Sequence, residues 1–471
     1  MKAPKHTLIY FVFLLLLTSC ANKVNTEISR GAEYVYRPGY PEVRFSAIGL
    51  FDEAGESHIN IHTDVVYGSL IYKKVNGLFT AEVAYNVQII KAGEENTTLV
   101  SERIDTTVFS EDRNVIFLQD VFSFKKNYPA PPGFYRINLS VTDLASNKQT
   151  YSTYTTTIPD PINTISDLTD VQLFNKDFAD STFRATTTYD VSSDGDSLKF
   201  LFQVTNNYNQ RLNLKTRLLK FQADTLPARP ISGVNYSTSS LSYKGIKFND
   251  EEVIQEYNRT LTDNGYVLVQ YNFKQLKRGN YRFEIILSDS ANKKLHYKAR
   301  DFGVKSPNYP SLKTPRELAA PLYYLMSEKE YKKLMAIESP TKLKHAIDRF
   351  WLKNIKSSST AKSVINLYYE RVEEANKQFS NFKEGWKTDM GMVYILFGPP
   401  YEVEKSLDKM WWYYSYNQSD PSTTFIFEQD KFKTKDFPFY HYVLYRDGSY
   451  FNYEYQQIQL WLTGTILKDN L

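Results

Sequence analysis

Five carboxylates gather in one short stretch of the chain, around a threonine and a tryptophan. They are Glu384, Asp389, Glu402, Glu404 and Asp408. Two carboxylates can act as general acid and general base when they face one cleft and their pKa values differ strongly. The spacing brings no two of the five together, and the chain has no GxSxG elbow, HExxH helix, P-loop or dinucleotide fingerprint. We therefore predict no catalytic residue, and a hydrolase centred on Asp389 is the least favoured alternative.

A second stretch, HINIHTD, has residue types that bind metal ions. Alternate residues share one face of a strand, and the residues on that face are His58, Asn60, His62 and Asp64. Imidazole and carboxylate are common zinc ligands, but no further ligand is near in the sequence. The alternative is the solvated face of an edge strand whose other face carries two isoleucines. We favour that alternative and predict no metal and no other cofactor.

A third candidate is the aromatic run MWWYYSY at residues 410–416. Large rings alternate on both faces of such a strand, and one face should join the core. If Trp411 or Trp412 is exposed on the other face, the strand becomes a platform for sugar stacking or a protein hot spot. Core packing on both sides accounts for the same pattern, and we favour it modestly.

The first twenty residues have the pattern of an export signal. Two lysines precede an apolar run from Leu8 to Leu17, which would rise only about 15 Å as a helix and is too short to span a bilayer. Leu17-Thr18-Ser19-Cys20 resembles a bacterial lipobox, and Cys20 is the only cysteine in the chain. We predict a lipoprotein signal peptide at residues 1–19 and lipidation of Cys20, so that acyl chains form the membrane anchor.

Charge and cysteine content exclude several classes of protein. The net charge of +4 is small for a chain of 471 residues and gives no electrostatic case for nucleic acid. A single cysteine excludes an intramolecular disulfide and a CxxC metal site. Stability must therefore come from burial, which a chain of this length can supply in several cores.

The elements that would carry these residues begin with a tether at residues 20–32, which is polar and irregular. LFTAEVAYNVQII at residues 78–90 alternates apolar and polar residues, as a half-buried strand does. GFYRINLSVTDLASNKQTY at 133–151 aligns without gaps on GNYRFEIILSDSANKKLHY at 279–297. The alignment predicts one β-hairpin used twice. We predict two β-sandwich domains, at residues 33–159 and 160–306.

The spacing of apolar residues changes beyond the prolines at 307–321. Ser327 stands three residues before Glu330, which is the spacing of a helix-starting capping box. Residues 341–356 and 361–380 continue in helical register. After Gly385 the period returns to two, which predicts strands at 392–397, 410–416 and 423–427 and a final hairpin turning at Asp447-Gly448. Residues 307–471 thus form an α+β domain with helices packed on an antiparallel sheet.

The segment EGWKTDMGMVYILFGPP carries a recognisable motif. Its residues are Gly385, Trp386, Thr388, Asp389, Gly391, Tyr394, Gly398 and Pro399. In this order and spacing they resemble the GWxTD-domain family, found largely in exported proteins and lipoproteins of Bacteroidota. The resemblance covers about the last 160 residues, does not reach the β domains, and brings no established reaction.

Turn chemistry accounts for every position of this motif. Gly385 would end a helix in the left-handed conformation, and Trp386 would fold over the seam between helix and sheet. Thr388 and Asp389 would bond nearby backbone groups. Gly391 would begin a strand that Gly398 and Pro399 end. The other interpretation makes Thr388 and Asp389 ligand-binding or catalytic, and we favour the structural one.

The chain as a whole is therefore predicted to be mainly β, with two tandem immunoglobulin-like β-sandwich domains followed by the α+β domain. We expect a non-catalytic outer-membrane lipoprotein that acts as an interaction or scaffold component of an envelope assembly. Its expected partners are the membrane and other envelope proteins, and the alternative is a glycan. Surface export favours acidic residues directly after the lipidated cysteine, but CANKVNTE at residues 20–27 has Lys23 there and its first acid only at Glu27, so we favour the periplasmic face.

Overall fold

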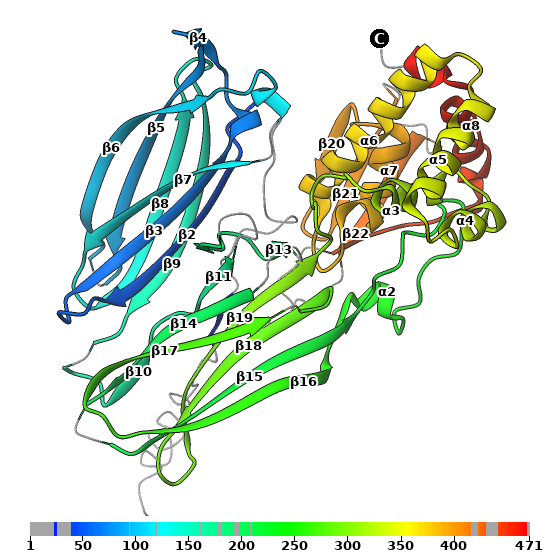
Figure 1. Ribbon diagram of the computed structural model, residues 1–471. Coiled ribbons are helices and arrows are strands. Elements are labelled where there is room, and N and C mark those ends of the chain that lie inside the picture. The colour runs from blue at the N-terminus through cyan, green and yellow to red at the C-terminus, as the bar shows by residue number, and fades with distance from the viewer. Residues whose placement is uncertain are drawn as a thin grey trace, which may run out of the picture.

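The computed structural model describes residues 23–25, 39–93, 95–117, 120–160, 162–176, 181–192, 197–207, 210–274, 276–415, 423–429 and 441–468. Two β units and a C-terminal region with helices meet near the centre of the molecule (Figure 1). The predicted signal peptide and Cys20 lie outside the described residues. Among the helices of the described ranges, none combines the length and apolar character that a membrane crossing requires.

The first β unit consists of two antiparallel sheets that share one core. The smaller sheet has the order β2-β3-β7, with β2 at Val43–Phe51, β3 at Ser57–Val66 and β7 at Val121–Pro129. The larger sheet has the order β6-β5-β8-β9, with β4 beside the start of β5. Its strands are β4 (Lys73–Val75), β5 (Leu78–Lys91), β6 (Thr97–Ser110), β8 (Gly133–Asp143) and β9 (Lys148–Ile158). Two short 3-10 turns, η1 (Tyr67–Ser69) and η2 (Val115–Phe117), complete the unit.

The second β unit repeats this plan with additional short strands. In one sheet β14 pairs with β17 on one edge and with β10 and β11 on the other, and β12 lies beyond β11. These strands are β10 (Ser166–Leu168), β11 (Gln172–Lys176), β12 (Phe183–Ala185), β14 (Ser197–Asn206) and β17 (Gly265–Lys274). The other sheet has the order β19-β18-β15-β16, with β13 also on β19. Its strands are β13 (Asp190–Ser192), β15 (Leu212–Ala223), β16 (Ile246–Leu261), β18 (Gly279–Ser288) and β19 (Lys294–Lys305).

The predicted repeat of one hairpin is confirmed and extends to the whole unit. In the first unit, strand β3 is followed by the hairpin β5–β6, by β7 and by the hairpin β8–β9. In the second unit, strand β14 is followed in the same order by the hairpin β15–β16, by β17 and by the hairpin β18–β19. Both terminal hairpins begin at a glycine, with φ of 152° at Gly133 and 156° at Gly279. Tyr135 donates its hydroxyl hydrogen bond to the carbonyl four residues upstream, and Tyr281 does the same.

The predicted tether is not simply a spacer. Lys23–Asn25 form strand β1, which runs parallel to β19 of the second unit, with Lys23 opposite Lys298. This part of the tether therefore lies against the second β unit.

The C-terminal region contains helices and a small sheet. Three helices were predicted correctly, and Ser327 and Glu330 form the predicted capping box at the start of α4. The helical elements are α3 (Pro315–Ala319), η3 (Ala320–Tyr324), α4 (Glu328–Met335), α5 (Pro340–Asn354), α6 (Ser358–Phe379), η4 (Gly385–Lys387), α7 (Asp389–Phe397), η6 (Gly448–Tyr450), α8 (Phe451–Thr463) and η7 (Thr465–Leu467). The antiparallel sheet has the order β20-β21-β22-β23, with strands at Glu402–Lys405, Lys409–Tyr413, Thr424–Gln429 and Tyr442–Leu444. A mainly β N-terminal region followed by helices and a small sheet is thus confirmed.

Two strands were predicted where the chain is helical. Residues 392–397 belong to helix α7, so Gly391 does not begin a strand. The final hairpin is also wrong, because Asp447 caps η6 and the chain continues as helix α8. Strands β21 and β22 lie where the aromatic segments predicted them.

The second β unit and the C-terminal region share apolar cores. Ala228 and Ile231, from the loop after β15, are fully buried in the core formed by helices α3 to α8. Phe382, just after α6, packs with Tyr189, Leu219, Phe221 and Ile246 of the second unit. The loop at residues 224–245, which carries the short helix α2 (Leu241–Lys244), therefore belongs structurally to both regions.

Candidate functional site

The motif begins where the chain leaves α6 and passes through η4 into α7. A Cβ on Gly385 would lie 1.9 Å from the carbonyl oxygen of Ala375, and one on Gly391 would lie 1.9 Å from the carbonyl oxygen of Gly385. Both glycines therefore allow close contact between backbones. The predicted left-handed conformation of Gly385 is wrong, since only Gly398 of the motif has a positive φ, of 84°.

Trp386 is buried beside α6 and η3. Its indole N–H donates to Glu384 Oε2 at 3.1 Å, and its carbonyl accepts a hydrogen bond of 2.7 Å from the Tyr324 hydroxyl. The ring also meets Tyr324 edge to face, with 6.1 Å between centroids. Trp386 is thus a packing residue whose polar atoms are paired internally.

Thr388 is the N-cap of α7. Its hydroxyl donates to the Gly385 carbonyl at 2.7 Å and accepts from the Gly391 N–H at 3.0 Å. These are the backbone hydrogen bonds that the sequence predicted for this residue, and N-caps of this kind typically contribute about 1 kcal/mol.

Asp389 forms a buried ion pair that the sequence did not predict. Its Oδ1 lies 2.6 Å from Arg446 Nη2 and its Oδ2 lies 2.9 Å from Arg446 Nη1, while the Leu444 N–H donates to Oδ2 at 2.7 Å. Asp389 is 5 % exposed. Both carboxylate oxygens are therefore engaged, and the residue holds β23 and the segment after it.

Arg446 extends this contact into the loop of the second β unit. It donates to the carbonyls of Pro230 and Arg229, each at 3.2 Å, and its guanidinium lies 4.5 Å from the ring centroid of Tyr236. Burial lowers the pKa of Arg446, but the adjacent Asp389 carboxylate outweighs this and raises it overall. Arg446 therefore stays charged, and its contacts fasten α7 to residues 229–236.

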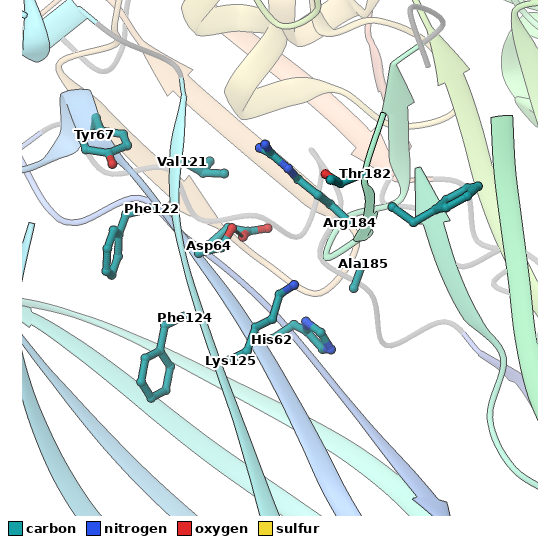
Figure 2. A pocket seen from close by; sticks show the side chains of 12 residues that line it. His62, Asp64, Tyr67, Val121, Phe122, Phe124, Lys125, Thr182, Arg184 and Ala185 are labelled. Carbon is teal, nitrogen blue, oxygen red and sulfur yellow. Dashed lines mark hydrogen bonds between the residues drawn. The ribbon is translucent and has the colours of Figure 1, made fainter. Parts of the chain in front are cut away.

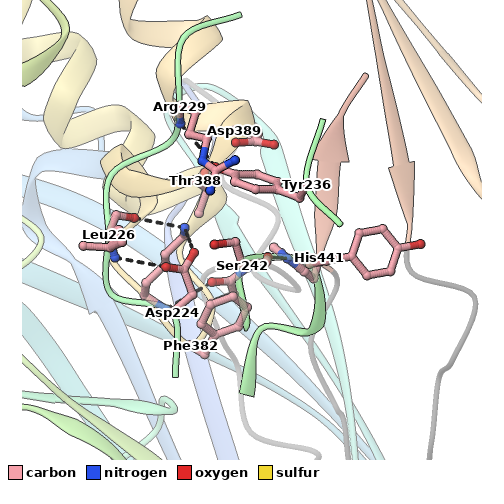
Figure 3. A network of polar contacts seen from close by, with 12 residues as sticks. Asp224, Leu226, Arg229, Tyr236, Ser242, Phe382, Thr388, Asp389 and His441 are labelled. Carbon is pink, nitrogen blue, oxygen red and sulfur yellow. Dashed lines mark hydrogen bonds and ion pairs between the residues drawn. The ribbon is translucent and has the colours of Figure 1, made fainter. Parts of the chain in front are cut away.

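Other contacts strengthen the same seam (Figure 3). Lys383 Nζ bonds Asp224 Oδ2 at 2.5 Å and the Leu226 carbonyl at 3.1 Å. His441 Nε2 lies 2.8 Å from the Ser242 carbonyl. Burial, followed by the charge of Lys383, lowers the pKa of His441, which is therefore neutral at pH 7 and suited to a structural role.

Glu384 is held at the same seam by positive charges. Burial opposes its ionisation, but Lys387, Arg278 and Lys305 outweigh that effect and lower the pKa of Glu384 to about 2. A carboxylate with such a low pKa is a poor general acid or base near neutral pH. The sequence grouped Glu384 with four other acids, and the structure pairs it with cations.

The last motif residues also point inward or end α7. Tyr394 is buried and donates its hydroxyl hydrogen bond to Glu374. Gly398 ends α7, and a Cβ there would lie 2.7 Å from Arg371 Nη2. Gly398 and Pro399 therefore end a helix, whereas the sequence analysis expected them to end a strand.

Trp412, a candidate for an aromatic platform, belongs to the core. This side chain is 3 % exposed and packs on Phe427 and Phe379, with centroid distances of 4.9 and 5.5 Å. Trp411, on the other face of β21, is half-buried. Core packing at Trp412 is what the favoured interpretation predicted.

Of the HINIHTD segment, His62 and Asp64 line a pocket of about 310 Å³ between the two β units (Figure 2). β3 is a central strand between β2 and β7, so the predicted edge strand is wrong. Asp64 accepts hydrogen bonds from Ser123 and Thr187, and His62 Nε2 lies 3.2 Å from Gln172 Nε2. Within the described ranges, no cluster of three or more histidine, cysteine or acidic side chains is placed to hold a metal ion.

A larger cavity of about 800 Å³ lies along the seam that the motif fastens. Its walls come from the loop at residues 226–242, from η3 and α4, and from α8. Tyr324 and Tyr236 line the cavity. Tyr324 also contacts Trp386 of the motif, and Tyr236 also contacts Arg446. Neither Thr388 nor Asp389 lines this cavity.

Several residues of the seam could not be identified from the sequence. Arg446, Asp224, Lys383 and Glu454 are far along the chain from their partners, and no motif marks them. The one signal in the sequence was Arg446, an isolated basic residue directly before Asp447-Gly448. The predicted hairpin placed it next to the turn.

Comparison with known proteins gives a match to one family model and weak structural likenesses to many solved structures, of which two are described. A crystal structure of red sea bream transglutaminase has 11% identity and a TM-score of 0.18 over 58% of this chain and 32% of that one. The fibronectin(III)-like modules of Clostridium thermocellum CbhA have 13% identity and a TM-score of 0.16 over 57% of this chain and 96% of that one. At these scores neither likeness bears on the fold or function. No curated protein matches the chain.

The family match extends from the end of the second β unit into the C-terminal region, and the loop at residues 224–245 lies outside it. It begins at residue 285, inside β18, and so includes β19 as well as the helices and the small sheet. The sequence analysis placed the resemblance outside the β units, and this is corrected. Residues 285–463 of the chain are a GWxTD domain.

Proposed function

We propose that this protein is a non-catalytic adaptor that presents its GWxTD domain rigidly to partner proteins of the cell envelope. The observation that carries the proposal is the Asp389–Arg446 pair. Asp389 and Thr388, which an enzyme would need in a cleft, are 5 % and 4 % exposed and are fully bonded to protein groups. A motif that joins two regions suits a protein whose purpose is to hold surfaces in a fixed arrangement.

The β units fit the role of spacers in this proposal. Each has one sheet built around a central strand, β3 or β14, and a second sheet that contains four long strands. Each also has the internal tyrosine hydrogen bond, at Tyr135 or Tyr281. A tyrosine bonded in this way at the start of a late strand is a feature of immunoglobulin-like sandwiches. We therefore assign both units to that class.

Lipidation of Cys20 would anchor the adaptor to the outer membrane, on the periplasmic face. The support is the lipobox-like sequence and the single cysteine. Cys20→Ala should release the protein from the membrane fraction and end the incorporation of labelled palmitate. Unchanged membrane association of this variant would contradict the anchor.

The adaptor function is tested by quantitative pull-down from cross-linked, detergent-solubilised membranes. We expect one or a few envelope proteins in stoichiometric amounts with the wild-type chain. Recovery of the protein alone, across several detergents and cross-linkers, would overturn the proposal. The glycan-binding alternative then depends on the half-buried Trp411, because Trp412 is buried.

A further inference from the structure

The cavity at the seam has the size and walls of a binding site. Its volume of about 800 Å³ falls within the range of about 300–1,000 Å³ found for ligand pockets. Most of its walls are aromatic or aliphatic, and the main contributors are Leu226, Tyr323, Tyr331, Phe451, Tyr455 and Ile458. In Figure 1 the loop that carries α2 rises from the second β unit toward α4, which brings the walls together.

Three tyrosines of the cavity have their hydroxyls engaged by the protein. Tyr324 donates to the Trp386 carbonyl at 2.7 Å, Tyr331 donates to the Ala320 carbonyl at 3.2 Å, and Tyr236 accepts from the Arg229 N–H at 3.2 Å. These tyrosines line the cavity, and their hydrogen-bonding groups are largely used. The cavity therefore suits apolar groups better than a sugar, which needs many polar partners.

The charges beside the cavity leave one cation uncompensated. Glu454 accepts three hydrogen bonds, from the Ile231 N–H, the Ser232 N–H and the Ser232 hydroxyl. Glu328 is paired with Lys332. Within the part of the chain that the structure describes, the Arg229 guanidinium forms no ion pair and lies 4.8 Å from the ring centroid of Tyr236. A carboxylate on the ligand would complement it.

The mouth of the cavity shows that the occupant is large. Leu226, Phe451 and Tyr455 are 67 %, 62 % and 57 % exposed, and the last two lie one turn apart on α8. A small amphiphile inside the cavity would leave these three side chains in water. A segment of another protein would cover them, and tyrosine, phenylalanine, methionine and arginine are the residues enriched at such contacts.

We infer that this cavity binds a peptide segment of a partner protein, with apolar side chains among the tyrosines and a carboxylate at Arg229. The inference rests on the proposed adaptor function and names the surface and the partner's chemistry. The motif has a defined part in it, because Trp386 bonds Tyr324 and Arg446 supports Tyr236 and the carbonyl of Arg229.

The test is selection of peptides from a random phage-displayed library of about twelve residues on the purified full-length chain. We expect enriched peptides to combine two or more apolar residues with Asp, Glu or a free C-terminus. Their affinity, measured by fluorescence anisotropy, should fall at least about tenfold for Phe451→Gln/Tyr455→Gln. Leu407→Gln, at a residue 95 % exposed that does not line the cavity, should bind as the wild type does. Arg229→Glu should select basic peptides instead.

Two results would overturn the inference. The first is that the enriched peptides bind the double variant as tightly as they bind the wild type, or that selection on Arg229→Glu still enriches peptides with an acidic residue. The second is that no peptide is enriched, while dodecanoate binds at one site and the double variant weakens that binding. If the double variant has a wild-type melting temperature and still captures the envelope partner, the adaptor function survives and this site is wrong. If the wild type captures no partner, the adaptor function itself fails.

Discussion

At Gly385 a single added atom should disturb the fold, because an added Cβ would lie 1.9 Å from the Ala375 carbonyl oxygen. Gly385→Ala should lower the free energy of unfolding by about 3 kcal/mol or more, since η4 must move away from α6. All five tryptophans of the chain lie beyond residue 350, so tryptophan fluorescence reports this transition selectively.

The matched control for this change is Gly448→Ala. A Cβ at Gly448 has no heavy atom within 4 Å, and its φ is not positive. The variant should unfold within about 0.5 kcal/mol of the wild type. Equal stability of the two alanine variants would show that the close contact at Gly385 does not exist.

The burial of His62 should make the protein less stable at acidic pH. Burial, followed by the charge of Lys125, lowers its pKa from 6.5 to about 4, and Asp64 opposes this only partly. Between these values the unfolded chain binds a proton that the folded chain does not, so the free energy of unfolding falls as the pH drops from about 6.5 to about 4. The loss should reach about 3 kcal/mol.

This prediction is checked by urea unfolding followed by circular dichroism, at about pH 7 and about pH 4.5. His62→Gln, which keeps a polar group near Gln172, should lose less stability than the wild type over this interval. The difference between the two proteins isolates His62 from His441, whose pKa burial also lowers. Parallel losses would contradict the buried, neutral state of His62.

At the scale of elements, Glu454 connects α8 to the loop of the second β unit. It accepts hydrogen bonds of 3.0 and 3.1 Å from the backbone N–H groups of Ile231 and Ser232. Glu454→Ala should speed amide hydrogen exchange at these two residues by at least about tenfold, because the loop loses its attachment. Exchange in the first β unit should not change.

Glu338→Ala is the control, since Glu338 is exposed on the same region of the protein. It should leave exchange at residues 231–232 unaltered. If Glu454→Ala also leaves it unaltered, the attachment between α8 and this loop is weaker than its geometry implies.

The sequence predicted the mainly β N-terminal region and the helices α4, α5 and α6, because their periodicity is clear. It failed at α7, where MVYILF is apolar on every side and has no helical period to detect. The Thr388 cap and Gly398 were present in the sequence, but they were read as turn residues around a strand. At α8 the Asp-Gly pair dominated the prediction, although Glu454, Gln457 and Trp461 are buried at helical spacing.

The seam was beyond prediction from one sequence for a different reason. Asp389 and Arg446 are 57 positions apart, and Lys383 and Asp224 are 159 apart. A threonine-aspartate pair indicates a local turn equally well, and Thr388 does cap a helix locally. The long-range role of Asp389 depends on where the loop at residues 224–245 folds, which no local pattern records.

At the scale of the whole molecule, the second β unit is joined to the C-terminal region by a seam of buried charges and shared apolar cores. Buried ion pairs add little net stability over apolar residues, but the loss of one partner is costly. This is why the motif aspartate can be structural and still intolerant of change. The cavity then forms only while the loop and helices remain joined.

The most direct test of this account is the unfolding of Asp389→Asn, followed by tryptophan fluorescence in guanidinium chloride. We predict a loss of about 3–5 kcal/mol, because Arg446 would stay buried without its counter-charge. Asp105→Asn, which breaks the exposed pair with Arg103, should cost less than about 1 kcal/mol. Asp389→Asn with wild-type stability and no partner capture would contradict the account, because Asp389 would then act directly in function.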